Sequence, residues 1–195
     1  MQESRSNVHN LPKDIAERAF NMVKTFVNKT EKNKSRPEHA GVESGLGDQM
    51  KSAVVFDLSV RDFELALQKE PLDANILIWY GQCMYWNTRF VHDHQKKQKL
   101  EESADGLFER ALKGKSVTQA KVYEAWAKAL QEEALVRKGW QRTLFLQRAL
   151  AQIQKCYQLE PDSREHYNAS FIKWHSLLAE QQEQLDPSGR TFGTV

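Results

Sequence analysis

The amino-acid sequence predicts an all-α protein. Proline, which disrupts helices, does not occur between Pro71 and Pro161, and only four of the nine glycines fall in that region. The same region is rich in Ala, Leu, Gln, Glu and Lys, the residues with the highest helix propensity. Runs of β-branched residues, which strands favour, are missing apart from the short Ala53-Val54-Val55.

The composition is that of an ordinary globular protein and excludes several classes. Of the 195 residues, 40% are hydrophobic and 28% are charged, and the net charge of +2 gives no strong attraction to nucleic acid or lipid. Cys83 and Cys156 are too few for a disulfide-rich scaffold, and we expect both to be small core residues. The first ten residues contain no apolar run, and no stretch is long and apolar enough to span a membrane. We therefore expect a cytoplasmic protein without a membrane span, a location that includes the cytosolic face of an organelle.

The chain divides into segments of different composition. Helical spacing of apolar residues predicts a first helix from Pro12 to Lys29. The residues that follow contain almost no large apolar side chain and include three closely spaced glycines, which is typical of a linker. We therefore expect an N-terminal helical arm over residues 1–29, a flexible linker over 30–50, one helical domain over 51–185 and a flexible tail over 186–195.

Proline, glycine and apolar spacing divide the helical domain into six helices. The first of them should end near Glu70, because Pro71 disfavours helical geometry in the residue before it. The expected helices run from Lys51 to Glu70, from about Ala74, through Leu107 to Gly114, around Trp126 up to Gly139, from Leu144 to Leu159 and from about Ser163 to Leu185.

A short pattern recurs at the ends of three of these helices. Phe63, Ala66 and Pro71 follow the order aromatic, small residue and proline, and residues 153–161 end in the same way. Ala104, Phe108 and Ala111 repeat the core of the pattern without the proline. The pattern resembles the closing half of the tetratricopeptide repeat (TPR), a helix–turn–helix unit of 34 residues.

Resemblance to this family implies a TPR-like α-solenoid, a right-handed array of antiparallel helix pairs that ends in a capping helix. Small residues such as Gly81 and Ala127 would allow the two helices of a pair to approach closely. Gly81 and Ala104 are 23 residues apart where the family has about 12, so the resemblance implies elongated helices or longer loops. An irregular helical bundle with proline endings by chance is the alternative.

Three short segments also resemble one particular subfamily. The segments Phe56-Asp57-Leu58, Pro71-Leu72-Asp73-Ala74-Asn75 and Trp79-Tyr80-Gly81 resemble the plant-type receptor subunit of the mitochondrial outer-membrane import machinery. This resemblance implies a receptor-like domain in mitochondrial protein import as an alternative function. Receptors of that family end in a membrane-spanning anchor, whereas this sequence ends in SGRTFGTV.

The sequence contains no motif of a known catalytic or nucleotide-binding site. His92-Asp93-His94 could offer metal ligands, but no further ligand stands at a recognisable spacing, so we expect a solvated turn. Acidic residues interrupt the basic runs, and the aromatic residues lie elsewhere, which disfavours nucleic-acid binding. We therefore expect a protein that is not an enzyme and holds no metal or cofactor. A nucleic-acid-binding helical domain is the weaker alternative.

The function class that remains is the binding of another protein. In the tetratricopeptide family the first helices of successive pairs line a concave groove that holds a peptide segment or a partner helix. Trp79 and Trp86 are seven residues apart, two turns on one helix face, and interface tryptophans are common anchors. Burial of both rings in the core is an equal alternative. The resemblance places eight residues in the groove, with the tryptophans beside two lysines: Trp79, Gln82, Tyr85, Trp86, Lys121, Glu124, Lys128 and Asn168.

Overall fold

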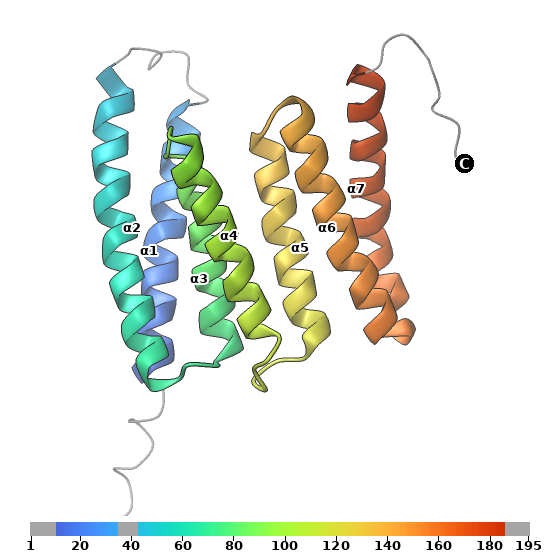
Figure 1. Cartoon of the computed structure of the whole chain (residues 1–195), viewed down its shortest axis with the longest axis horizontal. Coiled ribbons are helices and arrows are strands. Elements are labelled where there is room, and N and C mark those ends of the chain that lie inside the picture. Colours follow the sequence, from blue (N-terminus) through green and yellow to red (C-terminus); the bar gives the residue numbers. More distant parts are fainter. Residues whose placement is uncertain (1–10, 35–42, 186–195) are drawn as a thin grey trace, which may run out of the picture. The chain divides into compact units, whose positions relative to one another are not determined.

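A computed structural model describes residues 11–34 and 43–185 of the chain, and these residues are helical with short connections (Figure 1). The predicted all-α class is confirmed for them, because they contain no strand. None of the described helices is long and apolar enough to cross a membrane. The helices are α1 (Leu11–Lys34), α2 (Glu43–Lys69), α3 (Ala74–Asn87), α4 (His94–Ala111), α5 (Gln119–Val136), α6 (Gly139–Leu159), the short 3-10 helix η2 (Pro161–Ser163) and α7 (Arg164–Leu185).

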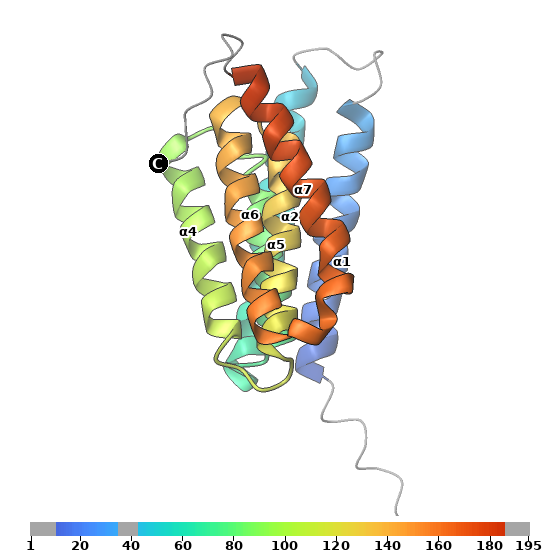
Figure 2. The same ribbon diagram turned by 90° about the vertical axis from the view of Figure 1, so that its right-hand side faces the viewer.

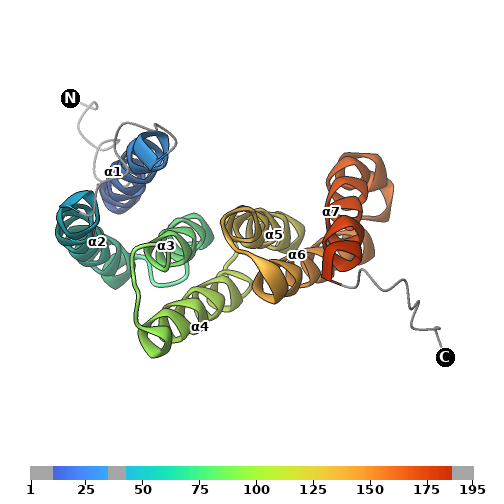
Figure 3. The same ribbon diagram turned by 90° about the horizontal axis from the view of Figure 1, so that it is seen from above.

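The chain forms two compact units that meet in sequence at Val117 and Thr118. Unit 1 contains α1 to α4, in which α1 packs on α2 and on α3, and α3 packs on α2 and on α4. The view from above shows α3 between α2 and α4 (Figure 3). Unit 2 contains α5 to α7, in which α6 packs on both α5 and α7, and α7 is inclined to α6 (Figure 2).

The expected segment boundaries need two corrections. Helix α1 continues to Lys34 and α2 begins at Glu43, so residues 30–34 and 43–50 are helical and do not belong to a linker. Both are polar continuations of amphipathic helices, and Thr30 is buried with its hydroxyl donating to the Phe26 carbonyl over 3.0 Å. Helix α1 is no separate arm, because it packs on α2 and α3. Residues 35–42 and the expected tail, 186–195, lie outside the described residues.

Side-chain caps fix where several helices begin. Asp73 caps α3, where its Oδ1 accepts hydrogen bonds from the backbone N–H groups of Asn75 at 2.8 Å and Ile76 at 3.0 Å. Thr118 caps α5 in the same manner. Helix α6 has no side-chain cap and begins at Gly139, whose φ of +55° suits glycine, so it starts five residues before the expected Leu144.

Buried positions on the second helix of each pair repeat at a fixed interval. Three kinds of position, one small, one large and one small again, recur 45 residues apart on α2, α4 and α6. Each of the nine side chains is fully or almost fully buried, which makes them the packing core of the helix pairs. They are Ser59, Ala104 and Ala149, then Phe63, Phe108 and Ile153, then Ala66, Ala111 and Cys156.

Gly81 allows α3 to lie close against α4. A Cβ atom placed on Gly81 would come within 2.9 Å of Phe108 Cε2 and within 3.3 Å of the Ala104 carbonyl oxygen. The Phe108 ring is fully buried, and buried side chains are closely packed. The expectation that Gly81 is a tight packing position is therefore confirmed.

We predict that Gly81→Leu destabilises unit 1 by roughly 1–3 kcal/mol, because the added side chain overpacks the contact with Phe108. Thermal unfolding followed by circular dichroism should show a clearly lower Tm. Gly106→Leu is the matched control, because a Cβ at this helical glycine meets no atom within 4 Å. Equal melting temperatures of the two variants would contradict the prediction.

Candidate functional site

The two tryptophans of the expected groove lie against α1. The Phe20 ring stacks on Trp79 and on Trp86, with centroid distances of 5.9 and 5.4 Å. Trp86 is buried and Trp79 is partly exposed. Trp86 is thus a core residue, and its expected place on an open groove is wrong, because α1 occupies that face of α3.

Tyr85 and Gln82 occupy different surroundings on the same helix. Tyr85 is completely buried, its ring lies 6.4 Å from that of Phe108, and its hydroxyl donates a hydrogen bond to Asp105 of α4. Tyr85 therefore belongs to the interior between α3 and α4, which corrects its expected place in a groove. Gln82 is partly exposed.

The other four expected residues belong to unit 2. Lys128 Nζ lies 2.5 Å from Glu124 Oε1, and His166 Nε2 lies 3.3 Å from the same oxygen. Burial alone would raise the pKa of the Glu124 carboxyl, but the hydrogen bond and charge of Lys128, with those of His166, hold this pKa below its ordinary value. Asn168 of α7 is exposed and accepts a hydrogen bond from the Tyr157 hydroxyl over 2.9 Å.

Glu124, Lys128 and His166 thus form one small polar cluster on α5 and α7, while Lys121 is exposed one turn before it. The partly exposed Trp79 and Gln82 belong to unit 1. The expected proximity of the tryptophans to Lys121 and Lys128 therefore stays a prediction.

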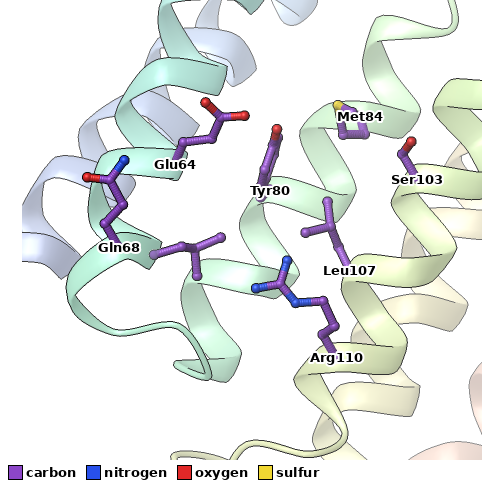
Figure 4. A pocket seen from close by; sticks show the side chains of 8 residues that line it. Glu64, Gln68, Tyr80, Met84, Ser103, Leu107 and Arg110 are labelled. Atoms are coloured by element: carbon purple, nitrogen blue, oxygen red, sulfur yellow. The ribbon is translucent and has the colours of Figure 1, made fainter.

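Unit 1 contains an open pocket of about 550 Å³ that the expected residue set did not include. Three helices line it, and Figure 4 shows Tyr80 of α3 between side chains of α2 and α4. Its apolar surface comes from Leu67, Tyr80, Met84 and Leu107, and its polar groups are Glu64, Gln68, Ser103 and Arg110. A pocket with apolar walls and a few polar groups is the usual form of a binding site.

Tyr80 forms the floor of this pocket. Its ring stacks on Phe63 of α2 at a centroid distance of 5.0 Å, and the residue is only 8% exposed. Burial, assisted by the nearby Glu64 carboxylate and opposed by Arg110, raises the pKa of Tyr80 to about 12. The hydroxyl is therefore protonated at neutral pH. It has no hydrogen-bond partner in the described part of the chain and can donate to a ligand.

Two opposite charges stand at the edge of the pocket. Arg110 of α4 donates one hydrogen bond from Nη2 to the Pro71 carbonyl over 3.2 Å, which leaves the other guanidinium donors for a ligand. Glu64 of α2 is exposed and forms no ion pair with a described residue. The pocket can therefore bind an apolar group together with one acidic and one basic group.

No metal site or reactive thiol lies among the described residues. They include no group of three or more His, Cys, Asp and Glu that could hold a metal ion. Asp93 caps α4, and its hydrogen bond from the Lys96 backbone N–H lowers the pKa of its carboxyl. Burial raises the pKa of Cys83 well above its usual range and that of Cys156 to about 12, so both thiols are protonated at neutral pH. Both cysteines are buried, as expected for core residues.

Sequence reasoning missed the pocket because its residues are spread between Glu64 and Arg110 on three helices. Each of these residues is ordinary within its own helix. Two signals were available, the small residue at Gly81 next to Tyr80 and the aromatic Phe63 in the repeat pattern. Neither signal indicates that a pocket lies next to these residues.

The raised pKa of Tyr80 predicts a specific sensitivity to alkali. A tyrosine whose pKa is 10.0 when unfolded and about 12 when folded stabilises the fold fully below pH 10, and this contribution is lost as the pH rises towards 12. Tyr80→Phe should lose less stability than the wild type over this interval. Urea unfolding at several pH values measures the difference. Tyr123→Phe, at a partly exposed position of α5, leaves Tyr80 in place, so it is the control and should lose stability over this interval as the wild type does.

Comparisons with models of protein families, with curated proteins and with solved structures gave no match. The geometry of the pocket and the repetition of the core positions are therefore the observations from which function is inferred.

Proposed function

We propose that this protein is a non-enzymatic protein–protein interaction module of TPR-like helix pairs, and that its pocket on unit 1 binds a peptide segment of a partner. One observation carries the proposal. The pocket between α2, α3 and α4 is open and apolar, and it exposes an unpartnered tyrosine hydroxyl beside an arginine and a glutamate.

The repetition of the chain supports the TPR-like part of the proposal. Helices α3, α5 and α7 begin at Ala74, Gln119 and Arg164, so each begins 45 residues after the previous one. The residues directly before them are Asp73, Thr118 and Ser163, which all favour helix N-termini. A tetratricopeptide repeat has 34 residues. The additional residues fit the lengths of α4, α5 and α6, which have 18, 18 and 21 residues.

The lining of the pocket indicates which peptide it binds. An apolar side chain of the ligand would fit between Leu67, Met84 and Leu107, where its burial supplies most of the affinity. The guanidinium of Arg110 suits an acidic side chain or a terminal carboxylate, which it can bind through two hydrogen bonds. Glu64 suits a basic side chain, and the Tyr80 hydroxyl suits a peptide carbonyl.

The protonation states around the pocket support a binding role over a catalytic one. A general base or nucleophile needs a pKa close to the working pH. Tyr80 has its pKa shifted to about 12, which is away from neutrality. Cys83, on the same helix as Tyr80, has its thiol pKa shifted in the same direction.

Selection of peptides from a random library on the full-length chain tests this function. We expect enriched peptides to share an apolar residue with an acidic residue nearby, because Arg110 contributes the positive charge of the site. Arg110→Glu should weaken the binding of these peptides at least tenfold, about 1.4 kcal/mol or more, and should select peptides with a basic residue in place of the acidic one.

Lys113→Glu is the matched control. It changes the charge of an exposed residue one turn after Arg110, but Lys113 does not line the pocket. Its peptide affinity should equal that of the wild type. The proposed function fails if no peptide is enriched, or if the selected peptides bind Arg110→Glu as tightly as they bind the wild type.

A further inference from the structure

The two charges that border the pocket of unit 1 come from opposite walls. Glu64 belongs to α2 and Arg110 to α4, and Figure 4 shows Tyr80 of α3 between them. Both charges act on the Tyr80 hydroxyl, because after burial, which raises its pKa most, the Glu64 carboxylate raises this pKa and Arg110 lowers it. Glu64 and Arg110 nevertheless form no ion pair with each other in the described part of the chain. Each charge is therefore available to a separate group of a ligand.

The two charges also lie at different positions along the pocket. The Arg110 guanidinium donates to the carbonyl of Pro71, which lies in the connection between α2 and α3. Glu64 precedes the last residue of α2, Lys69, by five residues, which is about 7.5 Å of helix. The positive charge is thus close to this connection, and the negative charge lies more than one helical turn away from it on the other wall.

Apolar side chains occupy the space between the charges. Leu67 of α2 and Leu107 of α4 belong to the two walls, and Tyr80 and Met84 belong to α3 between the walls. A ligand side chain that enters this space must be apolar to gain from burial. It then has the Glu64 carboxylate on one side and the Arg110 guanidinium on the other.

A peptide that matches both charges has a defined pattern. Its basic residue lies beside Glu64, its acidic residue lies beside Arg110, and an apolar residue stands between the two. An extended chain advances about 3.3 Å per residue, so charged side chains roughly two to four positions apart can reach both walls. A peptide with both charged residues on the same side of the apolar residue leaves one charge of the pocket unmatched.

We propose that the pocket selects peptides in which a basic and an acidic residue stand on opposite sides of an apolar residue, and that Glu64 selects the basic residue. This inference rests on the proposed function, because it specifies which peptides the same pocket binds.

The peptides enriched on the full-length chain test this pattern. Each enriched peptide is compared with two altered versions, one with glutamine in place of the basic residue and one with the basic residue moved beside the acidic one. The second version keeps the composition and the net charge of the original. Both should bind the wild type about threefold more weakly, which is the effect of one exposed ion pair.

Glu64→Gln tests whether Glu64 recognises the basic residue. It removes the charge but keeps a side chain of similar shape, and since Glu64 is exposed the variant should keep the wild-type Tm. This variant should bind the original peptide and its glutamine version with equal affinity. Glu64→Lys should bind a version with an acidic residue in place of the basic one more tightly than the original.

Asp57→Asn is the matched control. Asp57 is an exposed acidic residue of the same helix that does not line the pocket, so its variant should distinguish the peptides as the wild type does. The inference is overturned if the wild type binds the original and either altered version equally well, or if Glu64→Gln distinguishes them as strongly as Asp57→Asn does.

The affinity of Arg110→Glu separates this inference from the function on which it rests. Enriched peptides that bind Arg110→Glu more weakly, yet show no preference for the basic residue, overturn the inference and leave the proposed function in place. If no peptide is enriched, the proposed function and the inference both fail.

Discussion

Two adjacent residues of α3 determine how unit 1 is built. Gly81 has no side chain, which allows the Phe108 ring of α4 to lie against the α3 backbone. Its neighbour Tyr80 stacks on Phe63 of α2. Helix α3 is thereby in close contact with α4 on one side and with α2 on the other. The pocket lies above Tyr80 because these two contacts hold its walls in place while the space between the walls is left unfilled.

Because α1 packs against α3, the open apolar surface of unit 1 is on a different face of α3 from the one that carries the tryptophans. The face of α3 that carries Trp79 and Trp86 is covered by Phe20, and an ion pair between Arg89 and Glu31 connects the end of α3 to α1. The two tryptophan rings, which could have anchored a ligand, pack against α1 instead. The open apolar surface lies instead above Tyr80, between α2 and α4.

Helix α2 has three different surfaces. Phe56 and Phe63 face the core, Glu64 and Gln68 border the pocket, and Val54, Leu58 and Leu65 are exposed to solvent.

Sequence patterns predicted the class of the fold and many of the buried positions within its helices. The spacing of Phe63 and Ala66, and of Ala104, Phe108 and Ala111, identified side chains that are all buried. Helical periodicity and the small residue Gly81 were sufficient for this, because both act between neighbouring turns or within one helix pair.

Which helix faces are covered depends on how the helices pack against one another. An apolar stripe shows that a helix face packs against something, but it does not specify which helix packs there. For this reason Tyr85 and Trp86 were expected in a groove and lie in the core, whereas the pocket around Tyr80 was not expected. The residues that line this pocket are up to 46 positions apart in the sequence. The space between them depends on how three helices pack together.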